Sequence, residues 1–380
     1  MKKYIYITFL LVTGLCLVFS GCITQDEPED TDTGAEITLT DLSGRQVMLH
    51  EPANRIILQD SGAGGAFYTL FALDGKDAVK RIVGMDTELS DHRKWIWQKY
   101  VEAIPELDSI PTVGNGEDLN VESVIALKPD VLIVPEFRYN NTIDVYRKVE
   151  EAGIPVVIID FHSERPETHR QSIEVIGKVI GREDKAAELA NFYQEQIDEV
   201  TSRLEKIDTE KPAVYIECGM KGPSELYNTY GTFMWGALVE NCRGENIANG
   251  VIDEWGPLNP EYLLDKNPDV IIFTGSYWPA YEESLRLGYY STKEESEKTL
   301  DPFTERAGWE TINAVKSDRI YAIHHGLARD IWDFVAIQFI AKSIYPEEFK
   351  DLDPEANLKK FHEEFLPVEY SGVWSLQLGE

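Results

Sequence analysis

Two stretches of the chain carry one pattern: residues 119–134 read LNVESVIALKPDVLIV, and residues 258–273 read LNPEYLLDKNPDVIIF. In each stretch, an asparagine suited to a helix N-cap precedes a short helical run. The helix ends at Lys-Pro-Asp or Asn-Pro-Asp, because the residue before a proline is driven out of the α region. An apolar run typical of a buried strand follows. One helix–turn–strand unit that occurs twice predicts two halves of similar fold.

Short apolar runs elsewhere extend this pattern. RIILQ, RIVGMD and IPVVIID in the first half, and AVYIEC and RIYAIH in the second, are typical of buried strands in a parallel sheet. Helical stretches separate them, and this alternation indicates βαβ units. We therefore expect an α/β protein with one Rossmann-like lobe over residues 37–165 and another over 208–370.

The segment between the two lobes has a different pattern. Residues 166–207 contain no strand signal, and their apolar residues recur at three- and four-residue spacing. We expect one long rigid helix here that joins the lobes, although Gly177 and Gly181 leave open a break into two helices.

The composition limits the partners of the protein. The chain has 380 residues, more than one compact core usually holds, so two domains are expected. The formal net charge is -31. A surface of this sign disfavours nucleic acid and anionic membrane surfaces, because phosphate binding needs a positive face.

The N-terminus indicates export. Lys2 and Lys3 precede an apolar run that ends in Phe-Ser-Gly-Cys, which is typical of a secretory signal over residues 1–21. This ending resembles a lipobox with Cys22 as the lipidated residue, although Phe19 stands where leucine is usual. Residues 22–36 are acidic and almost free of apolar side chains, so we expect a tether. The alternative is an uncleaved membrane anchor, and both place the body outside the cytoplasm.

Two cysteines remain in the body of the protein. Cys218 and Cys242 could form a disulfide in an extracytoplasmic protein, or both could be buried free thiols. No cysteine or histidine spacing indicates zinc, and we assign no metal ligands.

The residues together resemble a known family. The lipobox, the two lobes with their connecting helix, ALKPDVLIV in the first lobe, and GENIANG, NPEYLLDKNPDVIIF and RIYAI in the second resemble the class III periplasmic substrate-binding proteins. These proteins serve ABC importers of ferric siderophores, haem and cobalamin. The resemblance covers about residues 37–366. It implies a ligand held between the lobes, modest lobe movement, delivery to an ABC permease dimer, and no catalysis or cofactor.

The resemblance also gives the repeated glutamates a role. Glu122 and Glu261 occupy the same position of the repeated unit. In the family, one acidic residue on each lobe docks onto arginines of the two permease subunits, and these two glutamates match that place. The alternative to docking is a role within each helix, because an acid in the first turn of a helix complements the helix dipole.

Candidate ligand residues follow from the strand pattern, because ligands of open α/β sheets bind outside the carboxyl ends of the strands. Aromatic faces suit a large planar or catecholate ligand, and arginines suit a carboxylate. Of the adjacent pair His324 and His325, at most one should face a ligand, because neighbouring side chains of a strand point opposite ways. The expected ligand residues are Asp60, Ser61, Arg138, Tyr139 and His162 in the first lobe, and Tyr227, Tyr230, Trp255, Tyr277, Trp278, His325, Arg329 and Trp332 in the second.

Other functions compete with this one. RIILQDSGAGGAF is similar to a dinucleotide-binding loop, but Phe67 occupies the third glycine position, and no nucleophile pattern of a hydrolase is present. We expect a lipid-anchored binding protein for a ferric siderophore or similar iron complex, with cobalamin or haem as the alternative. A non-transport surface lipoprotein is a third. A binder of bare metal is a fourth, if His162 and one of the adjacent histidines converged with Asp60 or Glu136.

Overall fold

The computed structural model describes residues 36–379. The expected signal, Cys22 and all but the last residue of the expected tether lie outside the described residues. Residues 35–380 form a unit of their own, and this unit contains the main sheet of each lobe. None of the helices within residues 36–379 has both the length and the apolar content needed to cross a membrane.

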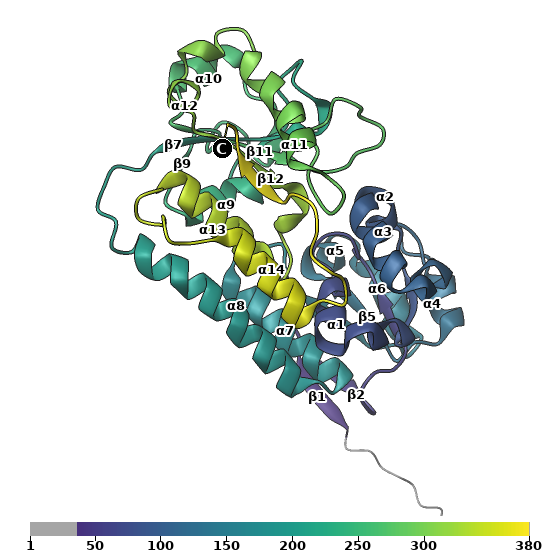
Figure 1. The fold of residues 1–380 in the computed structure, drawn as a ribbon. Coiled ribbons are helices and arrows are strands. Elements are labelled where there is room, and N and C mark those ends of the chain that lie inside the picture. The colour runs from purple at the N-terminus through teal and green to yellow at the C-terminus, as the bar shows by residue number, and fades with distance from the viewer. Residues whose placement is uncertain (1–35, 380) are drawn as a thin grey trace, which may run out of the picture. The chain divides into compact units, whose positions relative to one another are not determined.

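The first lobe is built on a four-stranded parallel sheet (Figure 1). Its strand order is β4-β3-β5-β6, and the strands are almost entirely buried, which is typical of parallel strands covered on both faces. The strands are β3 (Ile56–Leu58), β4 (Ile82–Met85), β5 (Val131–Pro135) and β6 (Val156–Ile159). The helices of this lobe are α1 (Phe67–Asp74), α2 (Glu88–His92), α3 (Lys94–Ala103), α4 (Val121–Leu127), α5 (Glu136–Asn141) and α6 (Ile143–Glu151).

A short hairpin protects the outer edge of this sheet. The loop between β1 (Ile37–Thr40) and β2 (Gln46–Leu49) bonds β6: Arg45 Nη2 donates to the Val156 carbonyl at 2.7 Å, and the Leu42 N–H donates to the Ile158 carbonyl at 3.0 Å. Backbone groups of an edge strand would otherwise be open to pairing with another chain.

The second lobe is built on a sheet of order β13-β12-β11-β7-β9. Only β13 is antiparallel, and it lies beyond residue 370, where we expected the lobe to end. The strands are β7 (Ala213–Cys218), β9 (Glu245–Asn246), β11 (Val270–Gly275), β12 (Ile320–His324) and β13 (Ser375–Gln377), with a separate pair β8 (Thr229–Tyr230) and β10 (Trp255–Gly256). The helices are α9 (Trp235–Asn241), α10 (Pro260–Lys266), α11 (Lys293–Leu300), α12 (Asn313–Lys316), α13 (Asp333–Ile344) and α14 (Pro354–Phe365).

The connecting segment is two helices, so the break that the glycines left open is present. α7 (Pro166–Ile180) ends at Gly181, whose φ of 66° is the left-handed conformation that glycine adopts at a helix C-terminus. α8 (Glu183–Leu204) then packs along α7 and continues to the second lobe (Figure 1). Gly177 is no break: it lies inside α7, where a side chain would collide with Ala186 of α8.

The repeated unit has the predicted structure in both lobes. The Asn120 side chain accepts a hydrogen bond from the Ser123 N–H at the start of α4, and the Asn259 side chain accepts one from the Glu261 N–H at the start of α10. Each helix ends in a left-handed residue immediately before a proline, and β5 or β11 follows. The two-lobed α/β fold is therefore confirmed.

Candidate functional site

Loops from the carboxyl ends of both sheets meet between the lobes. Arg329 Nε donates to Glu164 Oε1 at 2.9 Å, and Asn241 Nδ2 donates to the Glu164 carbonyl at 3.0 Å, so residues of both lobes are in contact. We call the partly accessible part of this region the inter-lobe site. It contains Arg93, Phe137, Arg138 and His162 from the first lobe, and Tyr227, Phe233, Trp255, Trp278, His325 and Arg329 from the second, with Asp60 buried beneath Arg138.

Arg138 already has a carboxylate partner within the first lobe. Its Nε donates to Asp60 Oδ2 at 2.8 Å and its Nη2 to Oδ1 at 3.1 Å, while the guanidinium lies 4.8 Å from the centre of the Phe137 ring. Burial raises the pKa of Asp60 to about 6, against the lowering effect of Arg138. Arg138 is therefore already paired with a carboxylate of its own lobe.

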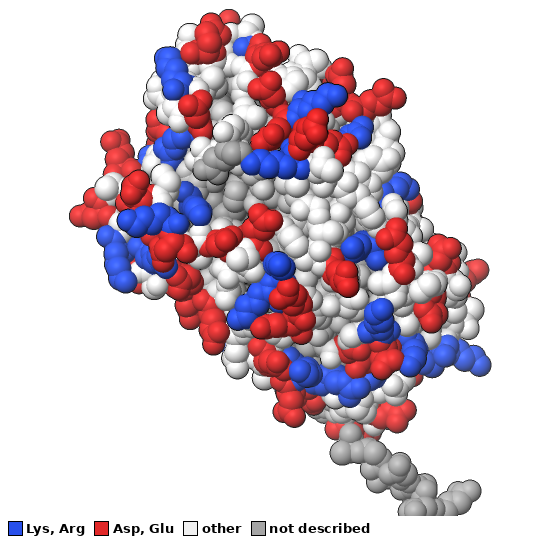
Figure 2. Space-filling model, viewed as in Figure 1, with Lys and Arg blue, Asp and Glu red and all other residues white. Residues whose placement is uncertain are grey.

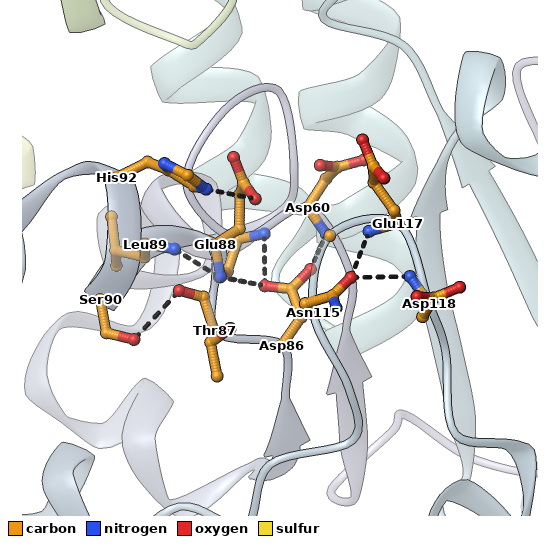
Figure 3. Close-up of polar contacts among 12 residues, drawn as sticks. Asp60, Asp86, Thr87, Glu88, Leu89, Ser90, His92, Asn115, Glu117 and Asp118 are labelled. Atoms are coloured by element: carbon orange, nitrogen blue, oxygen red, sulfur yellow. Dashed lines mark hydrogen bonds and ion pairs between the residues drawn. The ribbon is translucent and has the colours of Figure 1, made fainter.

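A hydrogen-bond network at the end of β4 fixes the loop that carries Asp60 (Figure 3). The carboxylate of Asp86 accepts hydrogen bonds from the backbone N–H groups of Asp60, Ser61 and Glu88, and from the Ser61 hydroxyl at 2.6 Å. Gly116 packs against this network, since a Cβ there would lie 2.5 Å from Glu88 Oε2. Ser61 is thus fully engaged in holding the loop.

Arg329 is the corresponding arginine of the second lobe. Its guanidinium lies 4.0 Å from the centre of the Phe233 ring and pairs with Glu164, and its φ of 66° is unusual for a residue with a side chain. Its Nη2 is buried without a hydrogen-bond partner among the described residues. Unlike Arg138, Arg329 retains a buried donor that is not used.

The histidines of the site are held in the neutral form. Burial, with the nearby arginines, lowers the pKa of His162 and His325 well below the usual value. His325 Nδ1 lies 2.8 Å from the Thr274 hydroxyl, and the ring is 5.6 Å from Trp278. His324 is buried, with its pKa lowered to about 3 mainly by burial, so only one of the adjacent histidines is partly exposed.

Three aromatic residues expected at the ligand are in the core instead. Tyr139 stacks on Tyr146, and its hydroxyl accepts a hydrogen bond from Arg45 Nη1 at 2.9 Å. Tyr230 is buried, and Trp332 is fully buried with its Nε1 bonded to the Gly326 carbonyl. These side chains can shape the site but do not line its accessible surface.

Helix α3 reaches the second lobe, a contact that we did not predict. Trp95 stacks on Tyr277, with ring centres 4.5 Å apart and planes 9° apart. Lys99 Nζ donates to the Ser371 hydroxyl at 3.1 Å, and the Tyr290 hydroxyl donates to Glu102 at 2.7 Å. We call these contacts the α3 latch. Figure 2 shows a largely uncharged surface where α2 and α3 approach the second lobe.

The latch changes the expected role of Tyr277, whose ring face is occupied by Trp95. Tyr227, Trp278 and Trp255 remain partly or well exposed, and Trp255 is 52% exposed. The run DHRKWIWQKY, residues 91–100, could have suggested the latch, because partly exposed tryptophans beside cations are typical of contact surfaces.

The structure also decides the disulfide alternative and the convergence of metal ligands. Cys218 and Cys242 are both free and buried, so the disulfide alternative is wrong. Within residues 36–379, no group of three or more His, Cys, Asp or Glu side chains is placed to hold a metal ion. The convergence of His162 with an acidic residue and a second histidine is therefore not found there.

The two repeated glutamates are exposed on separate lobes. Glu122 lies in the first turn of α4 and Glu261 in the first turn of α10. Neither side chain bonds another described residue, so both are available to a partner. Their positions in the first turn of a helix also fit the alternative role, in which each carboxylate only complements the helix dipole.

Comparison with known proteins agrees with this architecture. Residues 69–326 match the family model described as periplasmic binding protein. The chain belongs to this family. It is thus an extracytoplasmic substrate-binding component of an ABC transporter, a class of proteins that bind solutes and work with a permease.

Several relatives of this periplasmic binding protein are known. The crystal structure of the TroA-like periplasmic binding protein FepB from Veillonella parvula is 45% identical, with a TM-score of 0.87 over 90% of this chain and 100% of that one. The molybdate-binding protein MolA of Haemophilus influenzae is 24% identical over 88% of this chain and 92% of its own. The substrate-binding lipoprotein YvrC of Bacillus subtilis is 24% identical over 88% and 95%.

Proposed function

We propose that this protein captures a ferric siderophore or a similar iron complex at the inter-lobe site and delivers it to an ABC permease dimer. The observation that supports this ligand class is the lining of the site. Partly exposed aromatic rings from both lobes, Phe137, Phe233 and Trp278, lie beside neutral histidines and arginines. Aromatic faces suit the rings of a chelate, and neutral imidazoles add hydrogen bonds without adding charge.

The delivery step extends the proposal to the outer surface. Glu122 and Glu261 would each contact one permease subunit, as two-fold docking requires. The lobes over residues 37–165 and 208–370 would act as the two bodies that close on the ligand. Cys22 would carry the lipid that anchors the protein at the outer face of the cell membrane. No chemistry on the ligand is proposed.

Relatives bind other ligands, and these define the alternatives. Curated relatives include a vitamin B12-binding protein and a haem uptake protein, in addition to the molybdate-binding protein. Cobalamin and haem would use the same aromatic lining. A surface role without transport is the alternative of a different class.

Titration of the full-length protein in detergent distinguishes these ligands. The chain has eight tryptophans, and Trp278 and Trp255 lie in the site, so a bound coloured chelate should quench their fluorescence. The probes are a ferric tris-catecholate, a ferric tris-hydroxamate, haemin and cyanocobalamin. Saturable, sub-micromolar quenching by one ferric siderophore class supports the proposal. Saturation by haemin or cyanocobalamin alone would transfer the function to that ligand, and no saturation by any probe would favour the non-transport role.

A further inference from the structure

A loop of the second lobe carries residues of both the α3 latch and the inter-lobe site. Tyr277 and Trp278 are neighbours in the chain, shortly after β11. The Tyr277 ring faces Trp95 of α3, whereas the centre of the Trp278 ring lies 5.6 Å from that of His325 in the site. Farther along the same loop, Tyr290 contacts Trp95, with ring centres 5.8 Å apart. The loop that lines the inter-lobe site is therefore also the loop that holds α3.

This loop, residues 276–291, is attached firmly to the body of the second lobe. The Leu285 N–H donates to the Gly219 carbonyl at 2.9 Å, and a Cβ on Gly219 would lie 2.8 Å from the Leu285 Cβ, so the loop packs tightly on the residue after β7. Gly288 and Val373 exchange two backbone hydrogen bonds, of 2.7 Å and 3.3 Å. The loop therefore moves with its lobe.

Helix α3 is attached to the first lobe in the same way. Ile96 and Tyr100 are buried, and the centre of the Tyr100 ring lies 5.1 Å from that of Phe67 and 5.4 Å from that of Phe71, both in α1. Neither half of the latch can be displaced without its lobe. The latch therefore separates only when the two lobes move apart on this side.

The latch is accessible to water, unlike the contacts beside the connecting helices. Trp95 and Tyr277 are half-buried and Glu102 is exposed, at the largely uncharged surface seen in Figure 2. Water can replace the hydrogen bonds of the latch when they break. The Tyr193 hydroxyl and the Asp333 carboxylate, 2.8 Å apart, are buried and would lose their partners without replacement. Separation at the latch is therefore the less costly way to open a path to the inter-lobe site.

We propose that the α3 latch is a gate of the inter-lobe site, which separates each time the solute enters or leaves. Because Tyr277 and Trp278 are adjacent, separation of the latch uncovers the side of the site that Trp278 lines. The identity of the solute rests on the proposed function, but the movement of the gate is a property of the protein without ligand. A gate sets the rates of capture and release, because only the open fraction of the molecules admits or frees a ligand.

The alternative is a permanent clasp, in which the latch only fixes the lobes and the solute enters elsewhere. Weakening a gate raises the association rate constant kon and the dissociation rate constant koff by the same factor, since the latch closes in both the free and the loaded protein. Kd then stays nearly the same. Weakening a clasp leaves kon unchanged.

Distances between spin labels, measured in the full-length protein in detergent, test the movement without any ligand. One pair of labels is attached at Lys94 of α3 and Lys298 of α11, which are exposed on the first and second lobes. A reference pair is attached at Ala187 of α8 and Glu363 of α14, two exposed residues on helices that both pack against α13. The gate predicts a second, longer distance for the first pair and a single distance for the reference pair.

The double variant Trp95→Ala/Tyr290→Phe weakens the latch by removing the ring stack and the hydroxyl that donates to Glu102. The ratio of the longer to the shorter distance should rise by about 5- to 150-fold, as expected for one lost stack and one lost hydrogen bond. Trp97→Ala is the matched control, because Trp97 is a half-buried tryptophan of the same helix that packs against the hydrophobic core. The thermal midpoint of each variant reports any loss of fold.

Stopped-flow quenching by the chelate that the wild type binds tests the passage of the solute. Trp95→Ala should raise kon and koff together by about 2- to 12-fold, the factor that corresponds to the lost ring stack, and leave Kd within about twofold. Trp97→Ala should change neither rate constant by more than about twofold.

Two outcomes overturn the gate. An unchanged single distance between the labels at positions 94 and 298 in the double variant would show that the latch is a permanent clasp. An unchanged kon in Trp95→Ala would show that the solute enters elsewhere, and it would leave the proposed function intact. A wild type that binds none of the probes would refute the proposed function, and the label distances would still decide whether the latch opens.

Discussion

Replacing Arg306 by glutamine should destabilise the second lobe and weaken ligand binding together. Glu217 on β7 is fully buried, and Arg306 holds it with hydrogen bonds of 2.7 Å and 2.9 Å. The same guanidinium donates to the carbonyls of Pro223 and Glu225, both at 2.8 Å. The Tyr227 N–H donates to Glu217 at 3.0 Å. This pair therefore fixes the loop that carries Tyr227, one of the proposed ligand contacts.

The size of the stability loss in Arg306→Gln depends on the hydrogen bonds that Glu217 keeps in the variant. Removing one partner of a buried ion pair costs roughly 3–5 kcal/mol. In Arg306→Gln, the Tyr215 hydroxyl, at 2.8 Å, and the Tyr227 N–H still donate to Glu217. These bonds place the expected loss at pH 7 in the lower part of the range, at about 3 kcal/mol.

The stability that Arg306→Gln loses should depend on pH. Burial is the largest influence on the pKa of Glu217 and raises it even with Arg306 present, and removal of the arginine raises it further. A folded-state pKa above the unfolded value means that stability is lost as the pH rises through the folded pKa. The penalty of Arg306→Gln should therefore be smaller at pH 5 than at pH 7, where the carboxylate must stay charged.

Urea unfolding at both pH values measures this loss, with tryptophan quenching by the bound chelate as the functional readout. The double variant with Glu217→Gln should recover much of the stability, because a neutral amide needs no cation. Arg203→Gln is the control, since its pairs with Glu199 and Asp351 are at the surface and should contribute about 1 kcal/mol or less. A loss below about 1 kcal/mol in Arg306→Gln, or equal losses at pH 5 and 7, would refute the reasoning.

Three other predictions concern the latch, the first lobe and the permease. Trp95→Ala removes the stacking on Tyr277, worth about 0.5–1.5 kcal/mol beyond the buried area, and should raise hydrogen exchange at α3 before any other helix of the lobe. The pKa of Asp60, raised to about 6, makes the folded state lose up to about 3 kcal/mol as the pH rises from 4 through 6, and Asp60→Asn should lack this part of the pH dependence in urea titrations. Joint charge reversal of Glu122 and Glu261 should abolish uptake in cells while the Kd for the ligand stays the same; normal uptake would leave only the helix-dipole role.

The sequence was sufficient to predict the parts of the fold that depend on local pattern. The repeated unit has its caps, prolines and strand within sixteen residues, so each copy could be interpreted without knowledge of its surroundings. The break at Gly181 was also visible, although only the structure decided between one helix and two. The predicted strand ends then indicated which loops form the site, because the carboxyl ends of parallel strands lie at one edge of a sheet.

The remaining features depend on contacts between distant residues. The latch joins Glu102 to Tyr290, which are 188 residues apart, and no local spacing carries that information. Tyr139 follows a strand as expected, but Arg45 of the N-terminal hairpin holds its hydroxyl inside the lobe. Arg93 was missed because a single arginine in a polar run looks like any surface cation until its Nε is seen to be buried with no hydrogen-bond partner among the described residues.

The contacts between the lobes differ in strength, and this difference defines how the protein can open. On the side of the connecting helices, His169 of α7 is buried 2.9 Å from Asp333 of α13, and the Tyr193 hydroxyl of α8 donates to the same carboxylate, so separating them would leave buried polar groups without partners. On the other side, the α3 latch consists of one ring stack and two partly exposed hydrogen bonds, each worth about 1 kcal/mol. Opening should therefore begin at the latch and use the buried pair as its hinge.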